Sequence, residues 1–66
     1  MLMPNQSTII MKVYELIVIQ EGVERSLGVL YKDEKKAFVE KAVQNQRCGA
    51  ENNEYAPYQV RERVVQ

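Results

Sequence analysis

The sequence predicts a small α+β domain in which one three-stranded sheet is covered on one face by a single helix. Three runs of β-branched and aromatic residues fill 13–19, 24–31 and 58–65, as in strands that pack into a sheet. The segment 32–46 instead carries apolar residues at helical spacing. The expected order of elements is therefore strand, strand, helix, strand, written ββαβ.

The first strand, 13–19, is apolar on both faces. Because successive side chains of a strand point to opposite faces, Tyr14, Leu16 and Val18 share one face. The other face carries Val13, Glu15, Ile17 and Ile19. Two mainly apolar faces are typical of a central strand rather than an edge strand. The turn that follows is predicted to place Gly22 at positive φ.

The second strand, 24–31, follows a short turn and is expected to form an antiparallel hairpin with the first. Its pattern is more one-sided: Leu27, Val29 and Tyr31 alternate with Ser26, Gly28 and Leu30. A glycine inside a strand often marks a bulge or the close approach of another backbone. We therefore expect a bulge or a close backbone contact at Gly28.

The segment 32–46 is predicted to be the helix. Asp33 is its expected N-cap, because a carboxylate there accepts a hydrogen bond from an unpaired amide of the first turn. Gly49 is placed to end the helix, and the polar segment 48–57, with glycine and proline, predicts a loop. The expected buried stripe consists of Ala37, Phe38, Ala42 and Val43, with Val39 beside it.

The helix between the second and third strands predicts a right-handed crossover that leaves these two strands parallel. The last strand, 58–65, then lies either beside the second strand or beyond the first. Because the first strand is the most apolar, we expect it in the middle, which gives the spatial order 2-1-3. In that arrangement we expect Glu15 to meet Arg61 or Arg63 across neighbouring strands.

One domain is expected, 11–66, preceded by a flexible extension, 1–10. Residues 8–10 alternatively lengthen the first strand. Met11 followed by KVYELIV is typical of the start of a first strand, so either Met1 or Met11 is the true start. The apolar run 16–19 is far too short to cross a membrane and no targeting segment is evident, so we expect a cytoplasmic protein.

Charge and cysteine content argue against several classes of chemistry. Lys plus Arg and Asp plus Glu number nine each, so no net field favours nucleic acid or an anionic membrane. There is no histidine and Cys48 is the single cysteine, which removes an internal disulfide and the usual metal-ligand sets. No phosphate-binding glycine motif occurs. We therefore expect a non-enzymatic protein with no catalytic residue, metal or cofactor.

One helix covers only one face of a three-stranded sheet, so the other face needs a cover. Burying an aliphatic side chain there is worth roughly 1.5–3 kcal/mol, which is large for so small a domain. We expect a second copy to supply the cover through a homodimer interface of Val13, Glu15, Ile17, Ile19 and Val65. The alternatives are another protein, or the N-terminal residues with Ile9 and Ile10 folded under the sheet.

A second set of residues is a candidate contact for a partner protein or for nucleic acid. It consists of Lys32, Lys35, Lys36, Tyr58, Arg61 and Arg63. Cations bind phosphates and aromatic rings stack on bases, so a nucleic-acid-binding regulator is one alternative function. A nucleotide-binding sponge, with its groove between two subunits, is another. Interleaved carboxylates such as Asp33 and Glu62 dilute the positive field and favour a solvated surface of mixed charge.

The layout MKVYELIVIQEG, then GVLYKDEKKAFVEKAV, then YQVRERVV resembles very small phage-encoded proteins of ββαβ type. The resemblance covers 11–65 and rests on the pattern of elements. It implies an accessory protein of a phage or another mobile element that binds and inhibits a host factor, including defence systems. It implies no particular catalytic or binding residue.

Overall fold

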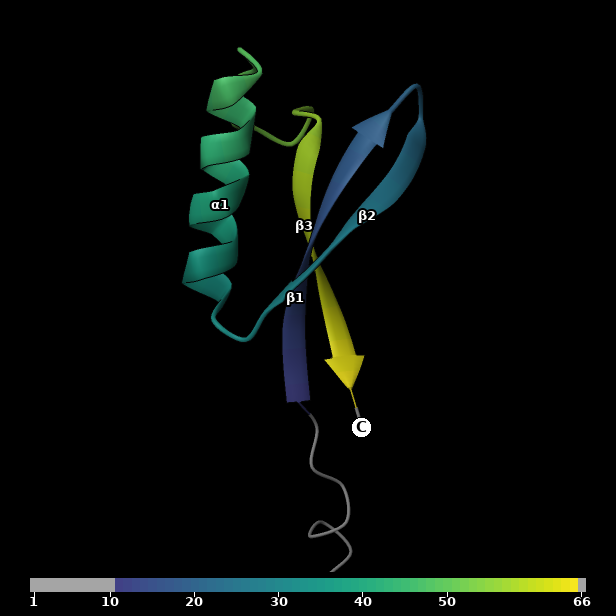
Figure 1. Ribbon diagram of the computed structural model, residues 1–66, viewed down its shortest axis with the longest axis vertical. Coiled ribbons are helices and arrows are strands. Elements are labelled where there is room, and N and C mark those ends of the chain that lie inside the picture. Colours follow the sequence, from purple (N-terminus) through teal and green to yellow (C-terminus); the bar gives the residue numbers. More distant parts are fainter. Residues whose placement is uncertain (1–10, 66) are drawn as a thin grey trace, which may run out of the picture.

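The computed structural model describes residues 11–65 and has the predicted ββαβ order (Figure 1). Its elements are β1 (Met11–Gln20), β2 (Val23–Tyr31), α1 (Glu34–Arg47) and β3 (Tyr58–Val65). The strands form one sheet in the order β2-β1-β3, as predicted. β1 is antiparallel to both neighbours, so β2 and β3 are parallel to each other. The expectations for residues 1–10 lie outside the described residues.

The turn between β1 and β2 has two residues at positive φ, Glu21 at 52° and Gly22 at 76°. Two such residues in a two-residue hairpin loop define a type I′ turn, whose twist matches that of the flanking strands. The predicted turn and the positive φ of Gly22 are both confirmed.

Gly28 lies in the predicted bulge. The register of the hairpin passes from Glu15 opposite Leu30 to Ile17 opposite Ser26. Between these two pairs, one residue of β1 lies opposite three residues of β2. Gly28 is the middle residue of these three and has a φ of 74°. β2 therefore has two more residues than β1 in this interval. Because two is an even number, Ser26 and Leu30 remain on the same face of the sheet. The bulge interrupts the backbone pairing of β2 at its centre.

Both predicted ends of α1 are confirmed. The Oδ1 atom of Asp33 accepts a hydrogen bond of 3.0 Å from the amide of Lys35. At the other end Gly49 adopts a φ of 78°, and its amide donates to the carbonyl of Gln46 at 3.1 Å. A left-handed residue after the last turn satisfies carbonyl groups that the helix itself leaves unpaired.

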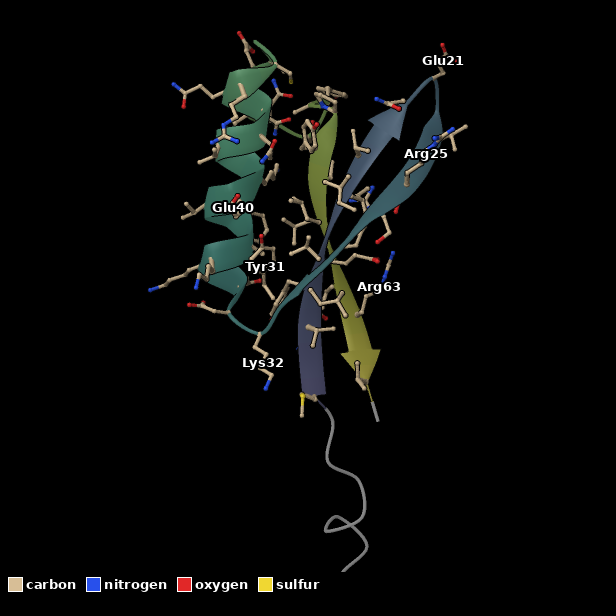
Figure 2. The ribbon with its side chains drawn as sticks, in the orientation of Figure 1. Glu21, Arg25, Tyr31, Lys32, Glu40 and Arg63 are labelled. Carbon is tan, nitrogen blue, oxygen red and sulfur yellow. The ribbon has the colours of Figure 1, made fainter. Side chains whose placement is uncertain are left out.

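α1 contacts all three strands and covers one face of the sheet. Figure 2 shows Tyr31 on the side of β2 nearest α1, whereas Arg63 lies on the side of the sheet away from the helix. Since Tyr14 is opposite Tyr31 in the register, the covered face also carries the alternate residues Leu16 and Val18. The buried apolar core consists of Val13, Leu16, Ile17, Val18, Ala37 and Ala56.

The predicted stripe of α1 is wrong in part. Ala37 is buried, and Ala42 and Val43 are half-buried. Phe38 and Val39 are exposed. The buried side of the helix instead follows Ala37, half-buried Lys41 and buried Asn45, which are four residues apart and so lie on one line. The ammonium group of Lys41 lies 5.6 Å from the centre of the Phe38 ring, so a cation covers part of that exposed ring.

A second cover protects the face of the sheet away from α1. Gln59 is directly opposite Ile17, and both side chains are buried. The Nε2 atom of Gln59 donates to the carbonyls of Ala56 at 2.8 Å and Asn53 at 3.0 Å. The loop between α1 and β3 is therefore bound to a side chain of this face, and Ala56 in the loop is buried. The expected need for a second molecule above Ile17 is met within the chain.

Candidate functional site

Five residues form what we call the charged sheet face, on the side of the sheet away from α1. They are Glu15 on β1, Glu24 and Ser26 on β2, and Arg61 and Arg63 on β3. Glu15 lies opposite Arg61 in the register, but its Oε1 atom is 2.9 Å from both Nε and Nη2 of Arg63. The predicted contact between Glu15 and one of the two arginines is confirmed. The hydroxyl of Ser26 donates to the other carboxylate oxygen at 2.5 Å.

Arg61 binds the second carboxylate of this face. Its Nε and Nη2 atoms donate to the two oxygens of Glu24 at 3.2 and 3.3 Å, which is a bidentate pair. Arg63 joins the two pairs, because its Nη2 atom is 3.9 Å from Glu24. Two cations face two anions, so the charged sheet face has no surplus of positive charge for a phosphate.

The carboxylate of Glu15 is held in its ionised form. The hydrogen bond from Ser26 lowers the pKa of Glu15; partial burial opposes this effect, and the hydrogen bond and positive charge of Arg63 add to it. A carboxyl group that acts as a general acid or base near neutral pH needs a raised pKa. The shift at Glu15 has the opposite direction.

The predicted dimer residues do not form an exposed apolar face. Ile17 is 1% exposed and Val13 is buried as well. Ile19 is half-buried, and Val65 is exposed at the end of β3. A side chain without exposed surface has no apolar area to give to a second copy. The expected exposure of Val13 and Ile17 is therefore wrong, while dimer formation itself stays a prediction.

Exposed apolar side chains lie on β2 instead. β2 is an edge strand, and all its residues except Tyr31 are exposed. Its large aliphatic side chains, which we call the β2 surface, are between 38% and 59% exposed: Val23, Leu27, Val29 and Leu30. Large apolar groups exposed on an edge strand are candidate contacts for another chain. The sequence signal was the aliphatic run on both sides of Gly28, which alternation alone assigns to both faces.

The structure separates the residues proposed to contact nucleic acid. Lys32, Lys35 and Lys36 are exposed at the start of α1. Figure 2 shows Lys32 at the turn that enters the helix, apart from Arg63 on β3. Arg61 and Arg63 are engaged by carboxylates. Tyr58 is half-buried, and both polar groups of its backbone are bound by Asn45.

Sequence reasoning missed three amide side chains that hold the loop between α1 and β3. Asn45, fully buried in the last turn of α1, also donates from Nδ2 to Asn52 Oδ1 at 3.1 Å. Gln59 binds two loop carbonyls, and Asn53 Oδ1 accepts from the amide of Tyr55 at 2.9 Å. The available signal was position: Asn45 lies eight residues after Ala37, on the buried line of the helix.

No protein-family model, curated protein or solved structure matches the chain. Within residues 11–65 there is no group of three or more acidic, cysteine or histidine side chains placed to hold a metal ion, and no pocket. No helix in this part of the chain is long and apolar enough to cross a membrane.

Proposed function

We propose that this protein is a small non-enzymatic interaction factor that forms a homodimer through the β2 surface. The observation that carries the proposal is the exposure of four large aliphatic side chains on one edge strand. Moving such a side chain from full exposure to full burial is worth roughly 1.5–3 kcal/mol, and these four, which are 38–59% exposed, have about half of that left to gain. A two-fold dimer buries the same surface on both copies, so every such side chain counts twice.

The bulge at Gly28 determines how two copies meet. A regular edge strand offers an unbroken row of backbone groups to a second strand. The bulge breaks this row at the centre of β2, so packing of Leu27, Val29 and Leu30 is the main contribution and a continuous six-stranded sheet is not formed.

The dimer is proposed to act as an accessory factor of a phage or mobile element that binds a host protein in the cytoplasm and blocks it sterically. The charged sheet face supports a protein target over a nucleic acid. A phosphate would have to displace Glu15 from Arg63, or Glu24 from Arg61, before it reached either guanidinium group.

Sedimentation equilibrium with two matched lysine substitutions tests the dimer. Leu30→Lys places a cation opposite Glu15, so the fold keeps a favourable cross-strand pair while the β2 surface loses an aliphatic group. Val65→Lys introduces the same charge at an exposed valine on the opposite edge strand. The wild type and Val65→Lys are expected to sediment as dimers at about 100 μM, and Leu30→Lys as a monomer.

Two outcomes would contradict the proposal. A wild-type monomer at this concentration would remove the dimer, and a monomer only in Val65→Lys would place the interface at the other edge of the sheet. Circular dichroism of Leu30→Lys must retain the wild-type spectrum, which separates loss of association from loss of folding. Retention of the wild type on a DNA column that weakens steeply with salt would favour the nucleic-acid alternative.

A further inference from the structure

Tyr55 belongs to the α1–β3 loop. This loop lies at the same end of the molecule as the C-terminal end of α1 and the β1–β2 turn (Figure 1). Tyr55 is 86% exposed, the highest value for a large apolar side chain in residues 11–65. An aromatic ring left in water forgoes the burial of roughly 150–250 Å² of surface. This ring therefore has more to gain from a partner than any side chain of the β2 surface.

The backbone around Tyr55 is held in place on both sides. Its own amide donates to Asn53 Oδ1, and the amide of Ala56 donates to the Asn53 carbonyl at 3.1 Å. Ala56 is buried and its carbonyl accepts from Gln59. The carbonyl of Pro57 accepts a 2.7 Å bond from the amide of Ile19, which ties the loop to β1.

A fixed loop matters for binding because a partner does not have to order it. Immobilising a flexible side chain at an interface costs about 0.5–1.5 kcal/mol, and ordering the backbone adds to this. Here only the two side-chain torsions of Tyr55 remain to be fixed. Rigid tyrosines of this kind are common among the few residues that carry most of an interface's binding energy.

Charge around Tyr55 indicates the chemistry of the partner. The loop 48–57 carries Glu51 and Glu54 and contains no Lys or Arg. The β1–β2 turn brings Glu21 to the same end of the molecule (Figure 2). Two cations offset part of this charge: Arg47 at the end of α1, and Arg25 on β2 close to Glu21 (Figure 2). The three carboxylates still outnumber them. Carboxylates repel nucleic-acid phosphates and attract a surface of Lys and Arg side chains.

We infer that Tyr55 is the anchor of a second interaction surface, and that its partner is a protein with an apolar pocket for the phenol ring and a basic rim. This surface is the one by which the homodimer would bind its target, so the inference rests on the proposed function. It is centred on the α1–β3 loop and uses no residue of the β2 surface or of the charged sheet face.

Selection from a phage-displayed library of random peptides tests this inference with a defined probe. Wild-type dimer is expected to enrich peptides that combine Lys or Arg with bulky apolar residues. Tyr55→Ala is expected to bind the same peptides at least about tenfold more weakly, a loss of 1.4 kcal/mol. Tyr55→Phe retains most of the affinity, and Glu54→Lys weakens binding in a manner that added salt diminishes.

The matched control is Val64→Ala, an exposed apolar residue on β3 remote from the loop, which should bind the peptides as the wild type does. No enrichment of peptides, or equal binding by Tyr55→Ala, would overturn the inference. Sedimentation of Tyr55→Ala should still show the dimer. A negative peptide result with an intact dimer therefore refutes the Tyr55 surface alone, whereas a monomeric wild type refutes the proposed dimer.

Discussion

Asn45 binds the backbone of Tyr58 with both polar atoms of its side chain: Nδ2 donates to the carbonyl oxygen at 3.1 Å, and Oδ1 accepts from the amide at 2.9 Å. The side chain thus pairs with the first residue of β3 as a neighbouring strand would. It joins the end of α1 to the start of the last strand across the loop, and it satisfies polar groups that burial would otherwise leave unpaired.

Asn45→Ala is expected to destabilise the protein by roughly 2 kcal/mol or more, because each buried polar group left without a partner costs about 1–3 kcal/mol. The measurement is urea denaturation followed by circular dichroism. Gln46→Ala, at an exposed position of the same helical turn, is the control and should change stability by less than about 0.5 kcal/mol. Equal stabilities of the two variants would contradict the role given to Asn45.

Stability is expected to fall in acid partly through Glu15. Because the pKa of Glu15 in the folded protein is below its usual value of 4.5, the folded state binds fewer protons than the unfolded state. The carboxylate therefore stabilises the fold fully above the unfolded pKa, and this contribution is lost as pH falls through the folded pKa. Glu15→Gln should lower stability at pH 7 and make its decline between about pH 5 and pH 3 shallower.

The control for this pH profile is Glu54→Gln, which removes a carboxylate at an exposed loop position. Its profile should run parallel to that of the wild type. Ser26→Ala removes the main cause of the lowered pKa and is expected to shift the acid transition in the same direction as Glu15→Gln. A profile of Glu15→Gln with the wild-type slope would show that the ion pair does not contribute.

Gly28→Ala should destabilise the fold by about 1–2 kcal/mol, the cost of placing a residue with a Cβ atom in the left-handed region. The space beside Gly28 is open, so strain in the backbone and not a clash is the reason. Gly28→Asn is expected to cost less, because asparagine tolerates positive φ better than alanine. Thermal unfolding of the wild type, Gly28→Asn and Gly28→Ala should show stability decreasing in that order. Equal losses of stability in the two variants would contradict the prediction.

Ile17→Ala is expected to cost about 2–5 kcal/mol, and Ile17→Val about 0.5–1.5 kcal/mol, as for buried core positions. Ile17→Lys should not yield a folded monomer, because it would bury a charge without a partner opposite Gln59. Chemical denaturation checks the first two values. A folded Ile17→Lys protein, seen by dispersed amide signals in NMR, would show that Ile17 is open to solvent after all.

The pattern of residues along the chain determined the elements and their order. Alternation in 58–65, a turn at Gly22 and a cap at Asp33 are local features, set by backbone geometry and hydrogen bonds within a few residues. The central place of β1 also followed from the sequence, because a strand that is apolar on both faces is most stable between two neighbours. The meeting of Glu15 with an arginine of β3 followed from this order.

Only the tertiary structure decided what covers each face of the sheet. The residue pattern shows one helix and a strand with two apolar faces. It cannot show that Ile17 is buried, or that Gln59 opposite it bonds to the polar loop 48–57. Asn45 and Gln59 hold this loop, because their amide groups bind backbone atoms of the loop and of Tyr58. Asn45 and Gln59 are far along the sequence from β1, so no local pattern around β1 encodes these contacts. For the same reason four large aliphatic side chains of β2 stay exposed, because the edge position and the bulge leave them without a cover.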